Sequence, residues 1–100
     1  MHNFIVNGTI QILPLAQDKH PYEWVDDAIE VIMASGIKYE VRPFSTELEG
    51  SYSEIIQLFN DVNERLYTMQ CNEWICNLQI QIRANEDMTA AEKTAKYDKN

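Results

Sequence analysis

The order in which the hydrophobic period changes along this chain is the feature that most restricts its fold. Apolar residues recur first at every second position, then at every third and fourth, and the six segments follow one another as strand, helix, strand, strand, helix, strand. A period of two is typical of a strand with one buried face, and a period near 3.6 of an amphipathic helix. This order belongs to the split β-α-β, or ferredoxin-like, arrangement. We therefore predict an α+β fold with one antiparallel sheet, two helices on one face of it and a short C-terminal helix.

Four segments carry the period of two, and we predict strands at residues 4–13, 37–42, 44–50 and 74–82. In the ferredoxin-like topology the first and third strands are central, the fourth lies beside the first and the second beside the third. Pro43 cannot donate to a strand ladder, so we expect a bend there, with the second and third strands paired as a hairpin or as neighbours. Gly8 interrupts the first strand and indicates a bulge or the close approach of another group.

The first predicted helix begins at Pro21, because proline is well placed in a first turn, and ends at Gly36, which favours a left-handed C-terminal conformation. Its predicted buried stripe has three- and four-residue spacing. The members of the stripe are Val25, Ala28, Ile29, Ile32 and Met33.

The second predicted helix begins at a capping box formed by Ser51 and Glu54. Its predicted buried stripe consists of Ile55, Ile56, Phe59, Val62 and Leu66. We expect Asn72 to supply the left-handed stop of this helix. A second capping box, Thr89 with Glu92, predicts the short C-terminal helix, which we expect to be polar and peripheral.

Length and charge limit the classes of function. One hundred residues form one domain, residues 1–100, and a net charge of −8 disfavours nucleic acid and anionic membranes as partners. The apolar runs are too short for a transmembrane helix, and the N-terminus has no signal-peptide pattern. We therefore expect a cytoplasmic protein, whose charge permits a cationic small molecule or a basic partner.

The cysteines and histidines predict no metal site. Cys71 and Cys76 are five residues apart, whereas His2 and His20 lie far from them in sequence. A zinc site needs about four ligands, usually in closely spaced pairs. The simplest interpretation is that both thiols are reduced and buried as small apolar groups, although the sequence alone does not determine their redox state.

One face of the predicted sheet is polar, and two interpretations of it stay open. Around its middle lie Asn7, Thr9, Gln11, Asn77, Gln79 and Gln81, and toward one edge lie Lys38, Glu40, Arg42, Ser45, Glu47 and Glu49. An antiparallel sheet tolerates a solvated face. The alternative is a surface for self-association, because amides and hydroxyls lose less conformational entropy on ordering than long charged side chains do.

The sequence does not predict an enzyme. It contains no glycine-rich phosphate loop, no nucleophile elbow and no histidine spaced from a Cys or Ser in a known catalytic pattern. Glu47 and Glu49 share one face of a strand, but carboxylate chemistry on a sugar needs the two groups across a cleft. We predict neither catalytic residues nor a cofactor.

Aromatic residues near carboxylates allow one binding hypothesis. Tyr22 and Trp24 open the first helix, and Tyr39, Phe44 and Tyr52 cluster around the paired strands. Each can be a packing residue of the core or its rim. Together with a carboxylate they can also form an electron-rich slot for an aromatic cation.

Several stretches of the chain resemble the YkoF-like thiamine-binding family. They are "PL" at Pro14–Leu15, "WVDDAIEVIMASGIKYEV" at Trp24–Val41, "PFSTELEG" at Pro43–Gly50 and "AEKTAKY" at Ala91–Tyr97. Members of this family are small ferredoxin-like proteins of bacteria and archaea. The chain departs from the family pattern in having Trp24 where a tyrosine is usual, and "MQCN" where a glycine commonly ends the second helix.

The resemblance implies a ligand, a set of site residues and an assembly. It implies binding of thiamine or its hydroxymethylpyrimidine moiety without turnover, in dimers or tetramers formed through the sheets. The matched candidate ligand-binding residues are Trp24, Tyr39, Phe44, Thr46 and Glu49. In a regular strand Thr46 and Glu49 point to opposite faces, so both reach one ligand only if the strand bends near Gly50 or a second subunit contributes.

Two functions follow as hypotheses. The first is non-catalytic binding of thiamine or hydroxymethylpyrimidine in transport, salvage or sensing. The alternative is a regulatory or structural module whose polar sheet face binds a protein partner.

Overall fold

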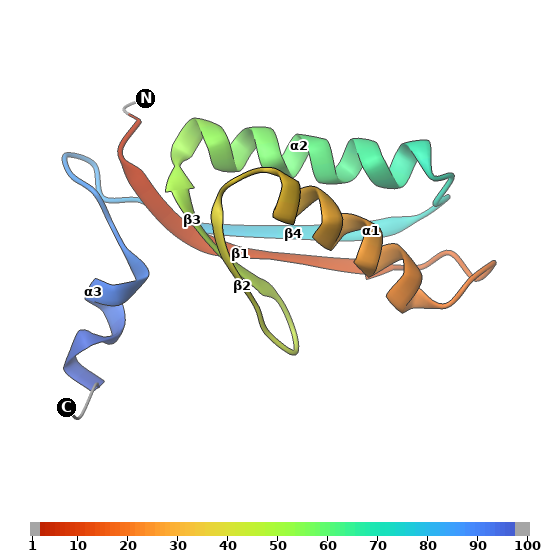
Figure 1. Ribbon diagram of the computed structural model, residues 1–100, viewed down its shortest axis with the longest axis horizontal. Coiled ribbons are helices and arrows are strands. Elements are labelled where there is room, and N and C mark those ends of the chain that lie inside the picture. Colours follow the sequence, from red (N-terminus) through yellow and green to blue (C-terminus); the bar gives the residue numbers. More distant parts are fainter. Residues whose placement is uncertain (1–2, 98–100) are drawn as a thin grey trace.

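The computed structural model describes residues 3–97, which form a four-stranded antiparallel sheet with helices (Figure 1). The elements in chain order are β1 (Ile5–Pro14), α1 (Pro21–Ala34), β2 (Lys38–Val41), β3 (Thr46–Ser51), α2 (Tyr52–Thr68), β4 (Trp74–Gln81), α3 (Ala90–Thr94) and the 3-10 turn η1 (Ala95–Tyr97). The strand order is β2-β3-β1-β4, as the sequence predicts. The fold is α+β and ferredoxin-like.

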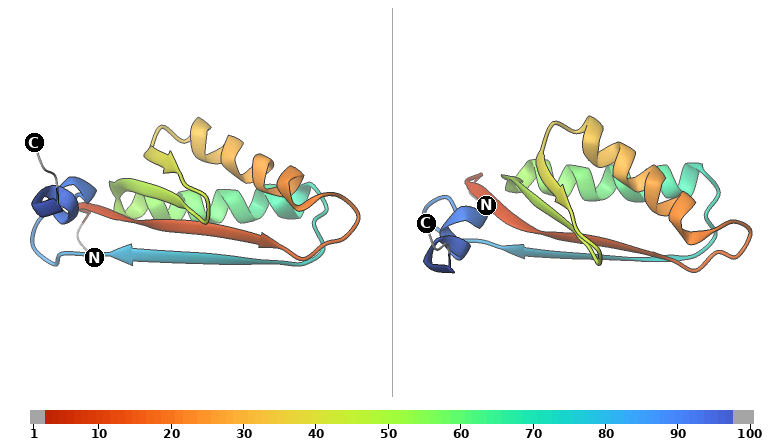
Figure 2. Two further views of the ribbon diagram at one scale, coloured as in Figure 1. Left: turned by 90° about the horizontal axis from the view of Figure 1, so that it is seen from below. Right: turned by 60° about the horizontal axis from the view of Figure 1, so that its bottom comes forward.

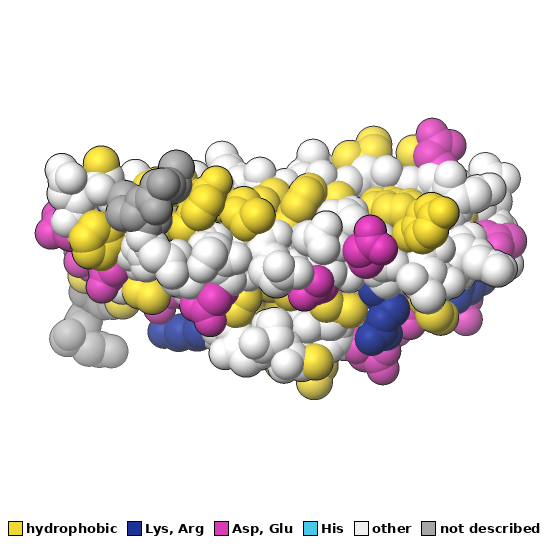
Figure 3. All heavy atoms as spheres, turned by 90° about the horizontal axis from the view of Figure 1, so that it is seen from above, with side chains coloured by type: hydrophobic (Ala, Val, Ile, Leu, Met, Phe, Trp, Pro, Cys, Tyr) yellow, Lys and Arg dark blue, Asp and Glu magenta, His cyan; other side chains and the backbone are white. Residues whose placement is uncertain are grey.

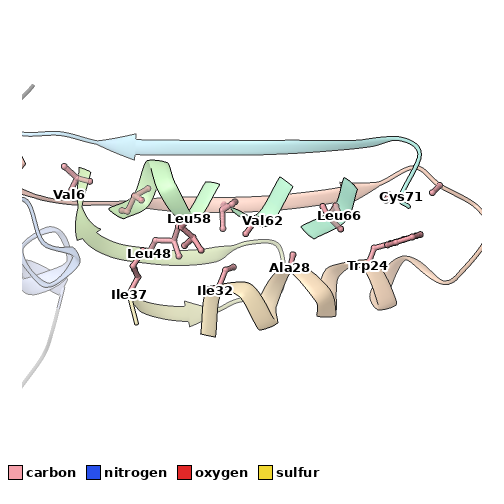
Figure 4. Close-up of a cluster of buried hydrophobic side chains, with 13 residues drawn as sticks. Val6, Trp24, Ala28, Ile32, Ile37, Leu48, Leu58, Val62, Leu66 and Cys71 are labelled. Carbon is pink, nitrogen blue, oxygen red and sulfur yellow. The ribbon is translucent and has the colours of Figure 1, made fainter. Parts of the chain in front are cut away.

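The molecule has two layers, and the core lies between them. Both long helices cover one face of the sheet, and the other face is open except at the end where α3 lies (Figure 2). The buried side chains extend from Val6 and Ile37 at one end to Trp24 and Cys71 at the other (Figure 4). Val6 and Ile10 of β1 point into this layer, so the predicted alternation of the first strand is confirmed.

The buried stripe of α1 is rotated from the predicted one. Trp24, Ala28 and Ile32 are buried, whereas Met33, which we placed in the stripe, is 57% exposed. Residues four apart lie above one another on a helix, so Trp24, Ala28 and Ile32 form one continuous row. Val25 and Ile29 are therefore left half-buried at the side of the core.

Residue 20 provides a cap for α1 that the sequence prediction missed. The His20 side chain accepts a hydrogen bond from the Tyr22 backbone N–H through Nδ1 (3.2 Å), and Glu23 accepts one from the His20 N–H (3.0 Å). At the other end Gly36 has a φ of 79°, the left-handed conformation that was predicted for it.

The second helix begins as predicted and ends differently. Ser51 and Glu54 form the predicted capping box, and their hydrogen bonds lower the pKa of the Glu54 carboxyl. Leu58 is buried in place of the predicted Ile56, which is 39% exposed. The left-handed residue is Gln70 (φ 68°) and not Asn72, two residues earlier than predicted.

That helix end is a Schellman motif. The Gln70 N–H donates to the Tyr67 carbonyl (3.0 Å), and the Cys71 N–H donates to the Leu66 carbonyl (3.0 Å). The motif satisfies two carbonyls at the helix end, so the chain closes this turn without the glycine that is common in the family.

Gly8 lies against the backbone of β4. A Cβ atom at this position would be 1.9 Å from the Gln79 carbonyl oxygen, so no other residue fits without a shift of the backbone. Of the two predicted explanations, the close approach of another group is confirmed.

The segment before α3 is held against β1, whereas α3 itself is peripheral, as predicted. Met88 is 4% exposed, and its N–H donates to the Ile5 carbonyl (2.8 Å). The Ile5 N–H donates to Asp87 Oδ1 (2.7 Å), and Asn7 Nδ2 donates to the Met88 carbonyl (2.9 Å). The helix itself has no buried residue, but residues 87–90, here called the C-terminal strap, are held against β1. The sequence signal was one apolar Met in an otherwise polar segment.

Candidate functional site

A cleft lies between α1, the end of β1 and the β2–β3 hairpin. Its volume is about 490 Å³, within the range of roughly 300–1,000 Å³ that is usual for small-molecule sites. We call it the α1–β3 cleft. Its apolar walls come from β1 (Ile10, Ile12), α1 (Val25, Ala28, Ile29) and the hairpin (Val41, Phe44). The rotation of α1 explains the helix wall, because Val25 and Ile29 are not used by the core.

The cleft lies where β1 extends beyond β3. Ile10 pairs with Thr46, the first residue of β3, whereas residues 11–14 of β1 pair only with β4. The edge of β1 that faces the cleft therefore has no strand beside it over these residues. Backbone N–H and C=O groups at such an edge are free to bind a ligand.

Thr46 lies at the base of the cleft and has an unusual environment. It is 6% exposed, and it and Asn7 are the two buried polar residues of the described chain. Asn7 donates to the Met88 carbonyl, but the Thr46 hydroxyl has no hydrogen-bond partner among residues 3–97. Trp24 Nε1 is the one buried side-chain nitrogen or oxygen without a partner among the described residues, so the Thr46 oxygen itself keeps access to solvent. A hydroxyl that lines a cleft and has no protein partner is available to a water or a ligand.

Two aromatic side chains lie at the rim of the same cleft. Phe44 stands at the tip of the β2–β3 hairpin and is 84% exposed, and Tyr22 in the first turn of α1 is 71% exposed. Exposed aromatic rings beside an apolar cleft offer stacking surface to a flat ligand. The cleft therefore combines an apolar wall, aromatic rims and one unpaired hydroxyl.

A second, larger hollow lies on the open face of the sheet beside α3. Its volume is about 770 Å³, and we call it the sheet-face hollow. Uncharged polar groups line its middle (Asn7, Thr9, Gln79, Gln81), and charged groups line its edge (Lys38, Glu40, Arg42, Glu47, Glu49, Lys93). The amides follow the register of β1 and β4, in which Asn7 faces Gln81 and Thr9 faces Gln79.

Glu49 in this hollow already has protein partners on both oxygens. Its Oε1 accepts a hydrogen bond from the Ala90 N–H (2.7 Å), and its Oε2 lies 3.5 Å from Lys38 Nζ. The side chain is 17% exposed. The carboxylate thus holds the C-terminal strap to β3.

The five residues predicted from the resemblance do not meet in one site within a single chain. Phe44 and Thr46 line the α1–β3 cleft, and Glu49 and Tyr39 border the sheet-face hollow. The strand continues straight through Gly50, which pairs with Val6, so no bend brings Thr46 and Glu49 together. A shared site would need a second chain.

Trp24, the fifth predicted residue, belongs to the core. It is 1% exposed, and its indole Nε1 has no hydrogen-bond partner in the described part of the chain. Lys19 Nζ lies 3.8 Å from the centroid of its ring, a cation–π geometry, and 3.9 Å from Asp27. Tyr22, Val25 and Ile29 were not predicted as site residues; the exposed aromatic in the first helical turn was the available signal for Tyr22.

The two cysteines are free. Cys71 is buried as expected, and Cys76 is half-buried. Burial raises the pKa of the Cys76 thiol, and a hydrogen bond with Asn63 opposes that rise. Within residues 3–97 no three His, Cys, Asp or Glu side chains gather closely enough to hold a metal ion, and His2 lies outside this range. None of the described helices has the length and apolar character to cross a membrane.

The surface charge is predominantly negative. Figure 3, which views the molecule from the α2 side, shows acidic side chains spread over the surface and basic ones in small groups among apolar patches. A net charge of −8 raises the local concentration of cations and disfavours anions.

The fold and the cleft define a small ferredoxin-like domain with an apolar cleft whose volume suits a small molecule. Over residues 8–98 the chain matches the family described as thiamine-binding protein, and it belongs to that family. It is 32% identical to a UPF0045 protein of Clostridium perfringens over 91 residues, which cover 91% of this chain and 95% of that protein.

Solved structures agree with this assignment. A domain of unknown function from Bacillus cereus has a TM-score of 0.89 and 30% identity, covering 96% of this chain and 92% of its own. A Thermotoga maritima protein assigned provisionally to thiamine biosynthesis or salvage has a TM-score of 0.83 and 32% identity, covering 94% and 99%.

Proposed function

We propose that this protein binds thiamine, or its hydroxymethylpyrimidine moiety, without converting it, and that the α1–β3 cleft is the site. The observation that carries the proposal is the Thr46 hydroxyl, which belongs to a residue that is 6% exposed, lines an aromatic-rimmed apolar cleft and lacks a hydrogen-bond partner among the described residues. A ligand that bonds to this hydroxyl takes the place of the water that would otherwise be its partner. Membership of the family supports the ligand class.

The chemistry of an aminopyrimidine suits this arrangement. Its flat ring can stack on Phe44 while Val25 and Ile29 cover its other side. Its amine and ring nitrogens need partners in the plane of the ring. The Thr46 hydroxyl and the open edge of β1 over residues 11–14 offer both donors and acceptors there.

Ligand contacts of Glu49, Tyr39 and Trp24 stay predictions. Glu49 lies on the far side of β3 from Thr46, so in our proposal it reaches a ligand in the cleft only as part of a second copy of the chain. The contacts of Glu49 with Ala90 and Lys38 favour a structural role within its own chain.

The lining of the cleft supports binding rather than turnover. Among the described residues that line it there is no Asp, Glu, His, Cys or Lys. The hydroxyls of Tyr22, Ser45 and Thr46 in the lining would need such a group beside them as a base to act as nucleophiles. We therefore propose a role in transport, salvage or sensing of the ligand in the cytoplasm.

Replacing Thr46 by Val tests the site, because it removes the hydroxyl and keeps the shape. We expect the affinity for thiamine and hydroxymethylpyrimidine to fall about tenfold, the value of a typical hydrogen bond to a ligand. Isothermal titration calorimetry measures the affinity. The matched control is Thr9→Val, which removes a hydroxyl from the sheet-face hollow and should leave the affinity unchanged. Equal effects of the two substitutions, or no binding by the wild-type protein, would contradict the proposal.

Self-association through the open sheet face is a second candidate function. Rows of amides cross this face, and Asn77 Nδ2 donates to Gln11 Oε1 across the strands (3.2 Å). Only the C-terminal strap and α3 lie over it among the described elements. Short amides lose little entropy when a second sheet orders them.

Two added charges on this face test the association. We expect the wild-type protein to be a dimer or tetramer and the double variant Gln79→Glu/Gln81→Glu to dissociate, since like charges would then face one another. Light scattering after size-exclusion chromatography measures the mass. The control Gln17→Glu/Asn60→Asp adds the same charge at exposed positions off the face and should keep the wild-type mass. A monomeric wild-type protein would exclude this assembly.

A further inference from the structure

The α1–β3 cleft contains one formally charged residue among those that line it in the described chain. That residue is Arg42, which follows β2 and borders both the cleft and the sheet-face hollow. A ligand phosphate in the cleft would depend on this guanidinium, because phosphate recognition in a protein needs cationic or N–H donors.

Two carboxylates already hold the Arg42 guanidinium. Arg42 Nη2 lies 3.0 Å from Glu40 Oε2, and Arg42 Nε lies 3.7 Å from Glu47 Oε2. The register of the hairpin places Glu40 directly opposite Glu47. Two like charges facing each other on adjacent strands repel, so Arg42 relieves a repulsion that would otherwise destabilise the hairpin.

The group of three therefore has a net charge of −1 beside the cleft. Both carboxylates belong to the open side of the sheet, since Glu47 pairs with Thr9 and lines the sheet-face hollow. Arg42 lines the cleft as well, but its guanidinium is engaged by these two carboxylates. A phosphate entering the cleft would meet an apolar wall and a nearby negative group.

We infer that the cleft selects the unphosphorylated ligand over its phosphate esters. Glu40 and Glu47 cause this selection, because their ion pairs with Arg42 keep its guanidinium from binding a ligand phosphate. The inference rests on the proposed function and adds to it the class of ligand that is rejected. Thiamine and hydroxymethylpyrimidine carry a free hydroxyl at the position where their esters carry a phosphate. A protein with this selectivity binds the free alcohol in preference to the diphosphate cofactor.

Calorimetry with thiamine and with thiamine diphosphate tests the selection. We expect the wild-type protein to bind the diphosphate at least about tenfold more weakly, as for loss of a charge-assisted hydrogen bond. In Glu40→Gln/Glu47→Gln, which frees Arg42, the affinity for the diphosphate should rise several-fold while the affinity for thiamine stays within about twofold.

A matched control separates this local effect from overall charge. The variant Glu30→Gln/Glu86→Gln removes the same two charges from ion pairs with Arg65 and Arg83, far from the hairpin in sequence. It should leave the preference of the wild-type protein unchanged. An equal gain in diphosphate affinity in the control, or equal wild-type affinity for the two compounds, would overturn the inference and leave the proposed function intact. No binding of either compound would overturn both.

Discussion

The α1–β3 cleft and the sheet-face hollow differ in whether their polar groups have protein partners. In the hollow, Asn7 and Glu49 are bound to the C-terminal strap, and the charged side chains at the edge pair with one another. In the cleft, the Thr46 hydroxyl has no protein partner among the described residues. Polar groups that satisfy one another stabilise a structure, whereas an unsatisfied one is available to a ligand. The larger hollow is for this reason the weaker candidate for a binding site.

Two aromatic residues that the resemblance groups together also differ in their surroundings. Trp24 is 1% exposed and Phe44 is 84% exposed, although the resemblance to the family predicts ligand contact for both. The burial of each ring determines whether it contributes to the stability of the fold or to ligand binding. A core ring contributes to stability, and an exposed ring beside a cleft contributes to binding.

The largest expected effect is that of Trp24→Ala. We expect it to lower the free energy of unfolding by about 3–5 kcal/mol, because it leaves a large cavity between α1 and α2. Phe44→Ala should leave stability within about 0.5 kcal/mol, as for most surface substitutions, and weaken thiamine binding. Denaturation in urea and calorimetry measure the two properties.

Tyr67→Ala is the control for the loss of an exposed aromatic ring. Tyr67 is 73% exposed on α2, away from the residues of the cleft, and its removal should change neither property. A wild-type stability in Trp24→Ala would show that this ring is not a core residue. A wild-type affinity in Phe44→Ala would remove the hairpin tip from the site.

A smaller effect is expected from Glu49→Gln. The charge-assisted hydrogen bond to the Ala90 N–H weakens, so we expect about 1 kcal/mol lower stability and faster hydrogen exchange at Ala90. Affinity for thiamine should stay unchanged if Glu49 acts only within its own chain. Glu64→Gln, at an exposed position of α2, is the control. Weaker binding with normal exchange at Ala90 would instead place Glu49 at the ligand, through a second copy.

Local patterns predicted the elements well and their orientation less well. The strands, the capping boxes of α2 and α3 and the sheet order all follow from periodicity and capping chemistry. The stripe of α1 did not, because Val25, Ile29 and Met33 are as apolar as the residues that are buried. Which of two adjacent apolar rows faces the core depends on how a helix packs against its neighbours, and a single sequence does not contain that information.

Contacts between distant segments were the least predictable. The C-terminal strap joins residues 87–90 to β1 and Glu49 across 41 to 82 positions of sequence. Each of its bonds has a backbone group, which every residue carries, on at least one side, so no pairing of side chains in the sequence marks them. The left-handed Gln70 after α2 was also missed. The length of this helix depends on where the chain must turn to enter β4, which is a property of the tertiary structure.

The sequence by itself determined the fold class, the order of the strands in the sheet and the family of the protein. The reason is that hydrophobic period and turn chemistry are local properties, written residue by residue. Only the tertiary structure decided that β3 continues without a bend, so that Thr46 and Glu49 border different hollows, and that Trp24 lies in the core. It also decided that the cleft exists. The cleft forms where β1 extends beyond its last pair with β3 and where one apolar row of α1 is left outside the core. Such a space depends on how three elements end relative to one another, which is a property of their packing and not of any one segment.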